Sequence, residues 1–404
     1  MLAKDFKEIA TKGTPEVPCT LTNSDKVFTV LQTLFERSFM PRVNRREIFS
    51  ETDVQVFHTI SRCVRRNHLC GWDRRSGRDY SHRREWIRGR LEELAGIFAV
   101  EVLGYALMAN HMHLVIRTRP DVVCGWSDNE IALRWWSLFP QRRTPSGLPE
   151  QPTKEELDHI KNSPVGLADK RRRLASVSWF MKCISEPIAK RANREDEVTG
   201  HFWEARFKAQ PLLDETAIAA CMAYVDLNPI RAAVARTPET SEFTSIHDRI
   251  VDRQSGIVAS SVDNVAVGSS AAPSISPANS QDLRAARGSA AGWLAPIALE
   301  SDCRPDFGEC NPRRLTNRGC LFMSLEQYLQ LIDWTGRQLR QDKAGQIPWH
   351  LDPILTRLDC TPETWLDLVK NFRRRFRTEA GRVETLANRQ SLRRHCRSSN
   401  RQRS

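Results

Sequence analysis

The segment 100–118, VEVLGYALMANHMHLVIRT, constrains the fold more than any other part of the chain. It contains two apolar stretches, 100–107 and 111–118, on either side of a short turn. Each stretch has the length of a strand, and a tight turn between two strands predicts an antiparallel hairpin. A sheet that contains this hairpin is therefore the basis of the predicted fold.

The segments before the hairpin add a strand and a helix. Residues 54–65 alternate and are rich in β-branched side chains, which predicts a strand. Residues 81–98 have the apolar spacing of an amphipathic helix. Strand, helix and hairpin in this order form the first half of a ferredoxin-like fold. We therefore predict an α+β protein with a ferredoxin-like antiparallel sheet and helices.

Further elements follow from local patterns. Residues 121–168 look like a polar insertion that contains prolines, and residues 169–192 predict one basic helix. The segment 200–213 fits either a strand or a short helix. A helix is predicted over 215–226, where Asn228-Pro229 stops it.

Composition divides the chain into five regions. Residues 25–40 have helical spacing, and 255–290 are rich in Ser and Ala, which is typical of a flexible linker. Beyond them, Ser324 and Thr361 are candidate N-caps of two helices. The predicted regions are a helical extension (1–49), a main domain (50–250), a linker (251–290), a small C-terminal helical accessory domain (291–380) and an Arg-rich disordered tail (381–404).

The charge of the chain favours a polyanionic partner. Lys and Arg outnumber Asp and Glu by 61 to 49, which gives a formal net charge of +12. A basic chain of this size makes nucleic acid the first candidate. Residues 372–404 hold eleven Arg and two Glu, so a basic tail on an otherwise neutral enzyme also fits the composition.

The eleven cysteines form no dense framework, which predicts reduced thiols in a cytoplasmic protein. The N-terminus has no apolar core of a signal peptide. The longest apolar stretch, 94–116, is interrupted by Glu101, Asn110 and the histidines, so no membrane span is expected.

The pair His111 and His113 is the sharpest chemical feature. Residues i and i+2 of a strand point to the same face, so two imidazoles at this spacing can bind one divalent metal. The same spacing is also compatible with two buried, hydrogen-bonded histidines that hold no metal.

The segment MANHMHLVIRT resembles the signature strand of the single-tyrosine HUH transposases, especially the REP-associated tyrosine transposases. HTISRCVRR resembles their first strand, and GHFWEARFKAQPLLDE followed by AYVDLNPIRAAV resembles their downstream region, in the same order. The resemblance covers about residues 50–250, which would make this the HUH catalytic and DNA-binding domain.

The resemblance implies a function in DNA transposition. Such proteins bind a hairpin in single-stranded DNA, then cleave and rejoin a neighbouring phosphodiester. The two histidines hold a divalent metal, Mg²⁺ or Mn²⁺, and a tyrosine attacks phosphorus and becomes joined to the 5′ end. Hairpin DNA is therefore the expected partner, and both a monomer and a homodimer fit the resemblance.

The sequence departs from the family at the nucleophile. Where many relatives have Tyr, the segment Trp203 to Lys208 has Phe207, which carries no nucleophilic atom. Among the four tyrosines, only Tyr224 lies in the downstream block that resembles the family. Tyr224 is therefore the candidate catalytic residue, and a packed helix tyrosine is the alternative.

Other site residues are predicted more broadly. Gln210 is a candidate third metal ligand, or an exposed polar side chain. Basic residues beside the motifs are candidate phosphate contacts, or solvated surface charges. They are Arg62, Arg65, Arg66, Arg206, Lys208 and Arg231.

Three functions fit these observations. The first is a metal-dependent transposase and endonuclease, which the intact His pair favours. The second is a catalytically impaired regulator that binds DNA hairpins, which Phe207 favours. A third is a metal hydrolase that activates water instead of a tyrosine.

Overall fold

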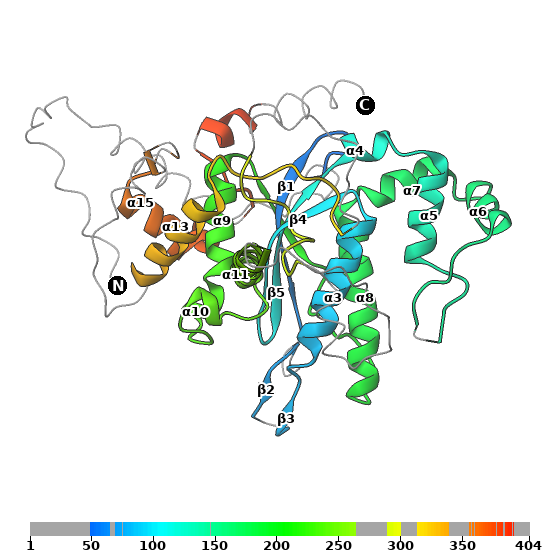
Figure 1. Ribbon diagram of the computed structural model, residues 1–404, viewed down its shortest axis with the longest axis horizontal. Helices are drawn as coiled ribbons and strands as arrows, with labels where there is room; N and C mark the ends of the chain where they lie inside the picture. Colours follow the sequence, from blue (N-terminus) through cyan, green and yellow to red (C-terminus); the bar gives the residue numbers. More distant parts are fainter. Residues whose placement is uncertain are drawn as a thin grey trace, which may run out of the picture. The chain divides into compact units, whose positions relative to one another are not determined.

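Four antiparallel strands form the central sheet (Figure 1). They are β1 (Gln55–Arg62), β4 (Val100–Leu107), β5 (His111–Thr118) and β6 (Lys208–Leu212), in the order β4-β5-β1-β6. Helix α3 (Arg83–Ile97) lies between β1 and β4 in the chain, and α8 (Val177–Glu195) lies between β5 and β6. This is the β-α-β-β-α-β order of a ferredoxin-like fold, so the predicted fold class and the hairpin are confirmed.

The computed structural model describes residues of one compact unit of the chain, Asn44–Ser404. The described residues are 49–64, 69–74, 76–145, 147–263, 289–299, 313–338, 355–356, 358, 360–376, 378–382, 384–389 and 391. The predicted helix at 25–40 and nearly all of the extension 1–49 lie outside them.

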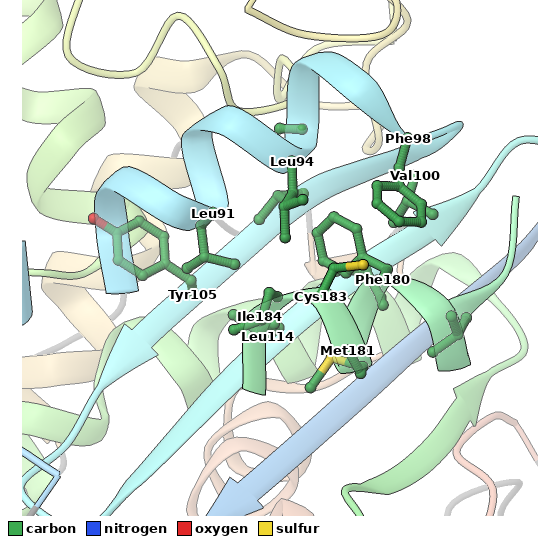
Figure 2. Packing of buried hydrophobic residues seen from close by; sticks show 14 of the residues in the cluster. Leu91, Leu94, Phe98, Val100, Tyr105, Leu114, Phe180, Met181, Cys183 and Ile184 are labelled. Atoms are coloured by element: carbon green, nitrogen blue, oxygen red, sulfur yellow. The ribbon is translucent and has the colours of Figure 1, made fainter. Parts of the chain in front are cut away.

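One side of the sheet, which we call the apolar face, carries Phe57, Met112 and Leu114. Helices α3 and α8 cover it, and their buried side chains join the strands in one apolar cluster (Figures 1 and 2). Figure 2 shows Leu94 of α3 and Phe180 of α8 within this packing. Each large side chain buried there contributes about 1.5–3 kcal/mol to folding.

The opposite side, which we call the histidine face, carries His58, His111 and His113. Helix α9 (Glu215–Asp226) covers it together with α15 (Pro362–Arg375). A second apolar cluster joins the sheet and α9 to α13 (Leu325–Gln338) and α15, and β6 forms a bridge from Leu212 to Ala380. The described residues of the region 291–380 thus pack on the sheet and on α9.

The predicted basic helix at 169–192 is two helices, so that prediction was wrong. Helix α7 (Leu167–Leu174) ends before Ser176, whose extended backbone interrupts the helical path ahead of α8. The carbonyl oxygen of Leu174 accepts a hydrogen bond from Ala99 N at 2.9 Å, so a partner outside the helix satisfies it.

The insertion at 121–168 contains regular structure. Helices α4 (Pro120–Cys124), α5 (Asp128–Leu138) and α6 (Lys154–Lys161) build it, and Ala132, Trp136 and Ile160 form a small apolar cluster there. The remaining short elements are β2 (Trp72–Asp73), β3 (Arg78–Asp79), α10 (Asn228–Arg231) and η1 (Pro238–Thr240).

Two expectations about irregular segments need correction. Helix α11 (Ser245–Asp263) runs into the predicted linker 251–290, and 264–288 lie outside the described residues. Residues 384–389 are helical although the tail was predicted to be disordered, and 392–404 lie outside the described residues. Composition alone did not reveal the helical register of these segments.

The predicted caps of the C-terminal helices are confirmed. Thr361 Oγ1 accepts a hydrogen bond from Thr364 N, and Ser324 Oγ accepts one from Gln327 N, each at 3.2 Å. Over the part of the chain that is described, no helix is both long and apolar enough to cross a membrane.

Candidate functional site

The histidine pair lies on the central part of the sheet. His111 and His113 are two residues apart on β5, and their ring centroids are 4.8 Å apart with the rings edge to face. His113 is fully buried, whereas His111 lies at the strand end and is partly accessible. The two rings therefore lie on the same face of the strand, as their two-residue spacing predicts.

A third histidine joins the pair from the neighbouring strand. His58 of β1 is buried and its Nε2 lies 2.9 Å from Nδ1 of His113, with the two rings stacked at 5.1 Å. Sequence analysis missed His58. The alternation of residues 54–65 placed it on the same side as Arg62, but nothing in one sequence showed that β1 pairs with β5.

The hydrogen bonds of the pair leave one nitrogen of each ring open. His111 Nδ1 bonds to Asn110 Oδ1 at 2.7 Å, so the proton of the neutral ring belongs on Nδ1 and the lone pair on Nε2. His113 uses Nδ1 for His58, and its Nε2 has no hydrogen-bond partner among the described residues. Two Nε2 atoms thus remain as candidate metal ligands.

The electrostatic environment keeps these imidazoles neutral. Burial lowers the pKa of His58 and of His111 to about 4, and it lowers the pKa of His113 well below 6.5. The charge of Arg373 lowers the pKa of all three histidines further, and Arg62 acts in the same direction on His111. A neutral ring is the form that binds a metal.

Tyr224 of α9 faces the histidines. Its ring centroid lies 5.7 Å from that of His113 and 6.0 Å from that of His58, nearly perpendicular to both. Phe372 of α15 stacks on the Tyr224 ring at 5.7 Å, and the Arg231 guanidinium lies 4.8 Å from the ring centroid. Burial raises the pKa of Tyr224, while the charges of Arg231 and Arg373 lower it.

Phe207 does not occupy the position expected for a lost nucleophile. It directly precedes β6 and packs against the apolar cluster of α3 and α8. Lys208 pairs with Ile60 on the histidine face, so strand alternation turns Phe207 to the other side. The expectation that Phe207 stands where the tyrosine should be is therefore wrong.

Gln210 lies on the histidine face but one strand away from the pair. It is the register partner of His58, and β1 separates it from β5. Its Nε2 donates a hydrogen bond to the carbonyl oxygen of Phe376 at 2.7 Å, which ties β6 to the end of α15. The structure thus brings His58, and not Gln210, into contact with His113.

The predicted basic residues are placed unevenly. Arg62 is the register partner of His111, and Arg231 lies over Tyr224. Arg206, just before β6, and Lys208, its first residue, are exposed. Arg65 and Arg66 lie outside the described residues.

The donor set fits a metal held by two imidazoles. No group of three or more His, Cys, Asp or Glu side chains is arranged around a metal position within the described ranges. The buried Nε2 of His113 without a partner, close to the His111 ring, is the feature that suits a metal ligand.

Comparisons with known proteins gave one similar solved structure. It is described as the structure of the REP associates tyrosine transposase bound to a REP hairpin, with 12% identity and a TM-score of 0.30 over 52% of this chain and 86% of that chain. No protein-family model and no curated protein matches the chain. At these values the likeness does not assign the chain to a family.

Proposed function

We propose that the chain is a metal-dependent nuclease and strand transferase for single-stranded hairpin DNA, with Tyr224 as the nucleophile. The observation that carries this proposal is the position of the Tyr224 ring, 5.7 Å from His113 on the face that also holds His111. A phenol beside two neutral imidazoles with free Nε2 atoms is the constellation that an HUH-type reaction requires.

His111 and His113 would hold a divalent metal, Mg²⁺ or Mn²⁺, through Nε2. When bound, such a metal polarises the phosphate and stabilises the charge that develops on it. His58 would orient His113, because the bond to Nδ1 directs Nε2 of that ring away from β1.

Tyr224 would form the covalent bond. Its hydroxyl oxygen attacks phosphorus, the bond from phosphorus to the 3′ oxygen breaks, and the phenolic proton is transferred to the departing 3′ oxygen. The products are a 5′-phosphotyrosine and a free 3′-OH, and the reverse reaction with another 3′-OH rejoins the DNA. The charge of Arg231 over the ring supports the reaction, because it stabilises the negative charge that develops on the phenolic oxygen as the proton leaves for the 3′ oxygen.

The hypothesis of an impaired hairpin-binding regulator rested on Phe207. Because Phe207 packs on the apolar face, its lack of a hydroxyl has no bearing on the histidine face.

A suicide-substrate gel tests the proposal. Full-length protein is incubated with Mn²⁺ and labelled single-stranded DNA hairpins that carry degenerate flanks, and covalent adducts are separated under denaturing conditions. The wild type should form an adduct and Tyr224→Phe should form none. Tyr80→Phe is the matched control, because Tyr80 lies beside Arg83 before α3. An adduct that persists in Tyr224→Phe would exclude Tyr224.

A further inference from the structure

Three arginines from separate elements surround the histidine and tyrosine site. They are Arg62 on β1, Arg231 on α10 and Arg373 on α15. No described carboxylate forms an ion pair with any of them, whereas Arg375, two residues beyond Arg373, is paired with Asp367 at 2.5 Å. All three arginines are exposed beside the buried histidines, and three positive charges without an ion-pair partner among the described carboxylates favour an anion there.

Each arginine acts on a different part of the site. Arg62 is the register partner of His111, and its charge lowers the pKa of that ring. Arg231 lies over the Tyr224 ring and donates a hydrogen bond from Nη2 to the carbonyl oxygen of Lys370 at 2.8 Å, which connects α10 to α15.

The register of α15 turns Arg373 toward the site. Phe372, the preceding residue, stacks on Tyr224 and also contacts His58, with ring centroids 6.2 Å apart. Arg373 follows the buried Val369 by four residues and so shares its side of the helix. Arg374 follows the exposed Lys370 by the same interval. Both Arg373 and Arg374 are exposed, and the charge of Arg373 lowers the pKa of all three histidines.

We propose that Arg373, together with Arg62 and Arg231, forms a binding site for the phosphate group on which Tyr224 acts. The site lies on the histidine face, and it takes a phosphodiester or a free phosphate monoanion. This inference rests on the proposed function for its substrate, but the anion site itself requires only the three guanidinium groups. Guanidinium groups suit this role because they bind phosphate oxygens through paired, charge-assisted hydrogen bonds.

With this role for Arg373, the C-terminal region takes part in the proposed reaction. Charge that grows on the phosphate oxygens as Tyr224 attacks is stabilised most by donors already fixed in place. Phe372 of α15 stacks on Tyr224 and so fixes the backbone of this helix, from which Arg373 extends, beside the site. Helix α15 is then part of the reaction centre, although it lies outside the segment 50–250 that resembles the transposases.

The experiment compares Arg373→Gln with Arg374→Gln as the matched control, in full-length protein. The first measurement is the rate of adduct formation with the hairpin pool and Mn²⁺. Removal of one charge-assisted hydrogen bond should slow Arg373→Gln by about tenfold to a hundredfold, and Arg374→Gln should match the wild type. Arg373→Lys should recover part of the rate, and guanidinium ion added to Arg373→Ala should recover part as well.

The second measurement is binding of inorganic phosphate without metal or DNA, by titration calorimetry. Arg373→Gln should bind phosphate about tenfold more weakly than the wild type and Arg374→Gln. If the wild type forms no adduct but shows this difference, the proposed function fails and the anion site stands. If Arg373→Gln and Arg374→Gln are equal in phosphate binding and in any adduct formation, the inference about Arg373 is overturned.

Discussion

The two faces of the same sheet differ in what they bury. The apolar face packs Phe57, Met112 and Leu114 against α3 and α8 and buries mostly carbon and sulfur. The histidine face buries imidazole rings that bond to each other beneath α9 and α15. Burying polar rings costs free energy that an apolar residue would not cost. Apolar packing stabilises the fold on both faces, and only the histidine face in addition buries polar rings, which the proposed function would use.

The largest expected difference is between variants of two adjacent residues of β5. His111→Ala should reduce metal-dependent cleavage by about a thousandfold, because one of two metal ligands is removed, and should leave hairpin binding and unfolding nearly unchanged. Met112→Ala should cost about 2–5 kcal/mol of unfolding free energy, measured by urea denaturation, with normal cleavage per folded molecule. Equal cleavage by His111→Ala and the wild type would contradict the assignment of the cleavage site to the histidine face.

His58→Phe tests whether the contact between strands prepares the ligand. Removal of the bond to His113 Nδ1 should weaken Mn²⁺ affinity by about tenfold or more, because the ring of His113 loses its orientation. Calorimetric titration with Mn²⁺ measures this without any DNA. His58→Phe should have little effect if His113 is held by packing alone, and unchanged affinity would leave His58 a purely structural residue.

Phe207→Tyr tests the assignment of residues to the two faces, because no gain in adduct formation is expected from it. Since Phe207 packs on the apolar face, a hydroxyl there should not raise adduct formation above the wild-type level. The double variant Tyr224→Phe, Phe207→Tyr should therefore remain inactive in the suicide-substrate gel. An adduct mapped to residue 207 in that protein would show that the assignment of faces is incorrect.

The smallest effect concerns the end of the chain. Residues 392–404 contain five Arg and no acidic residue. Their removal should flatten the slope of log K against log salt by about 0.7 for each phosphate that the shortened protein no longer neutralises, with no change in the preferred hairpin. Filter binding at several salt concentrations measures the slope. A changed hairpin preference would mean that these residues read DNA sequence.

Sequence reasoning predicted what depends on local pattern. The hairpin of β4 and β5, helix α9 and the N-caps Ser324 and Thr361 follow from apolar spacing and turn chemistry. The shared face of His111 and His113 follows from the two-residue period of a strand.

What depends on pairing between distant segments was not predictable. His58 becomes a site residue only because β1 lies beside β5, and Gln210 is set apart because β1 lies between it and the pair. Phe207 was misassigned because the boundary of β6, and with it the face of each residue, was ambiguous. Arg373 gave no signal, since a basic residue on an amphipathic helix is most often a solvated charge.

The order of these elements along the chain has a consequence during synthesis. Strand β1 is translated early and α15 late, so a nascent chain can assemble the sheet before the helix that stacks Phe372 on Tyr224 has left the ribosome. Until then α9 covers the histidine face without α15, and His58 and His113 lack part of the burial that lowers their pKa in the complete fold. The candidate site is therefore completed late, and an unfinished chain can have the sheet before it has the fully covered histidine cluster.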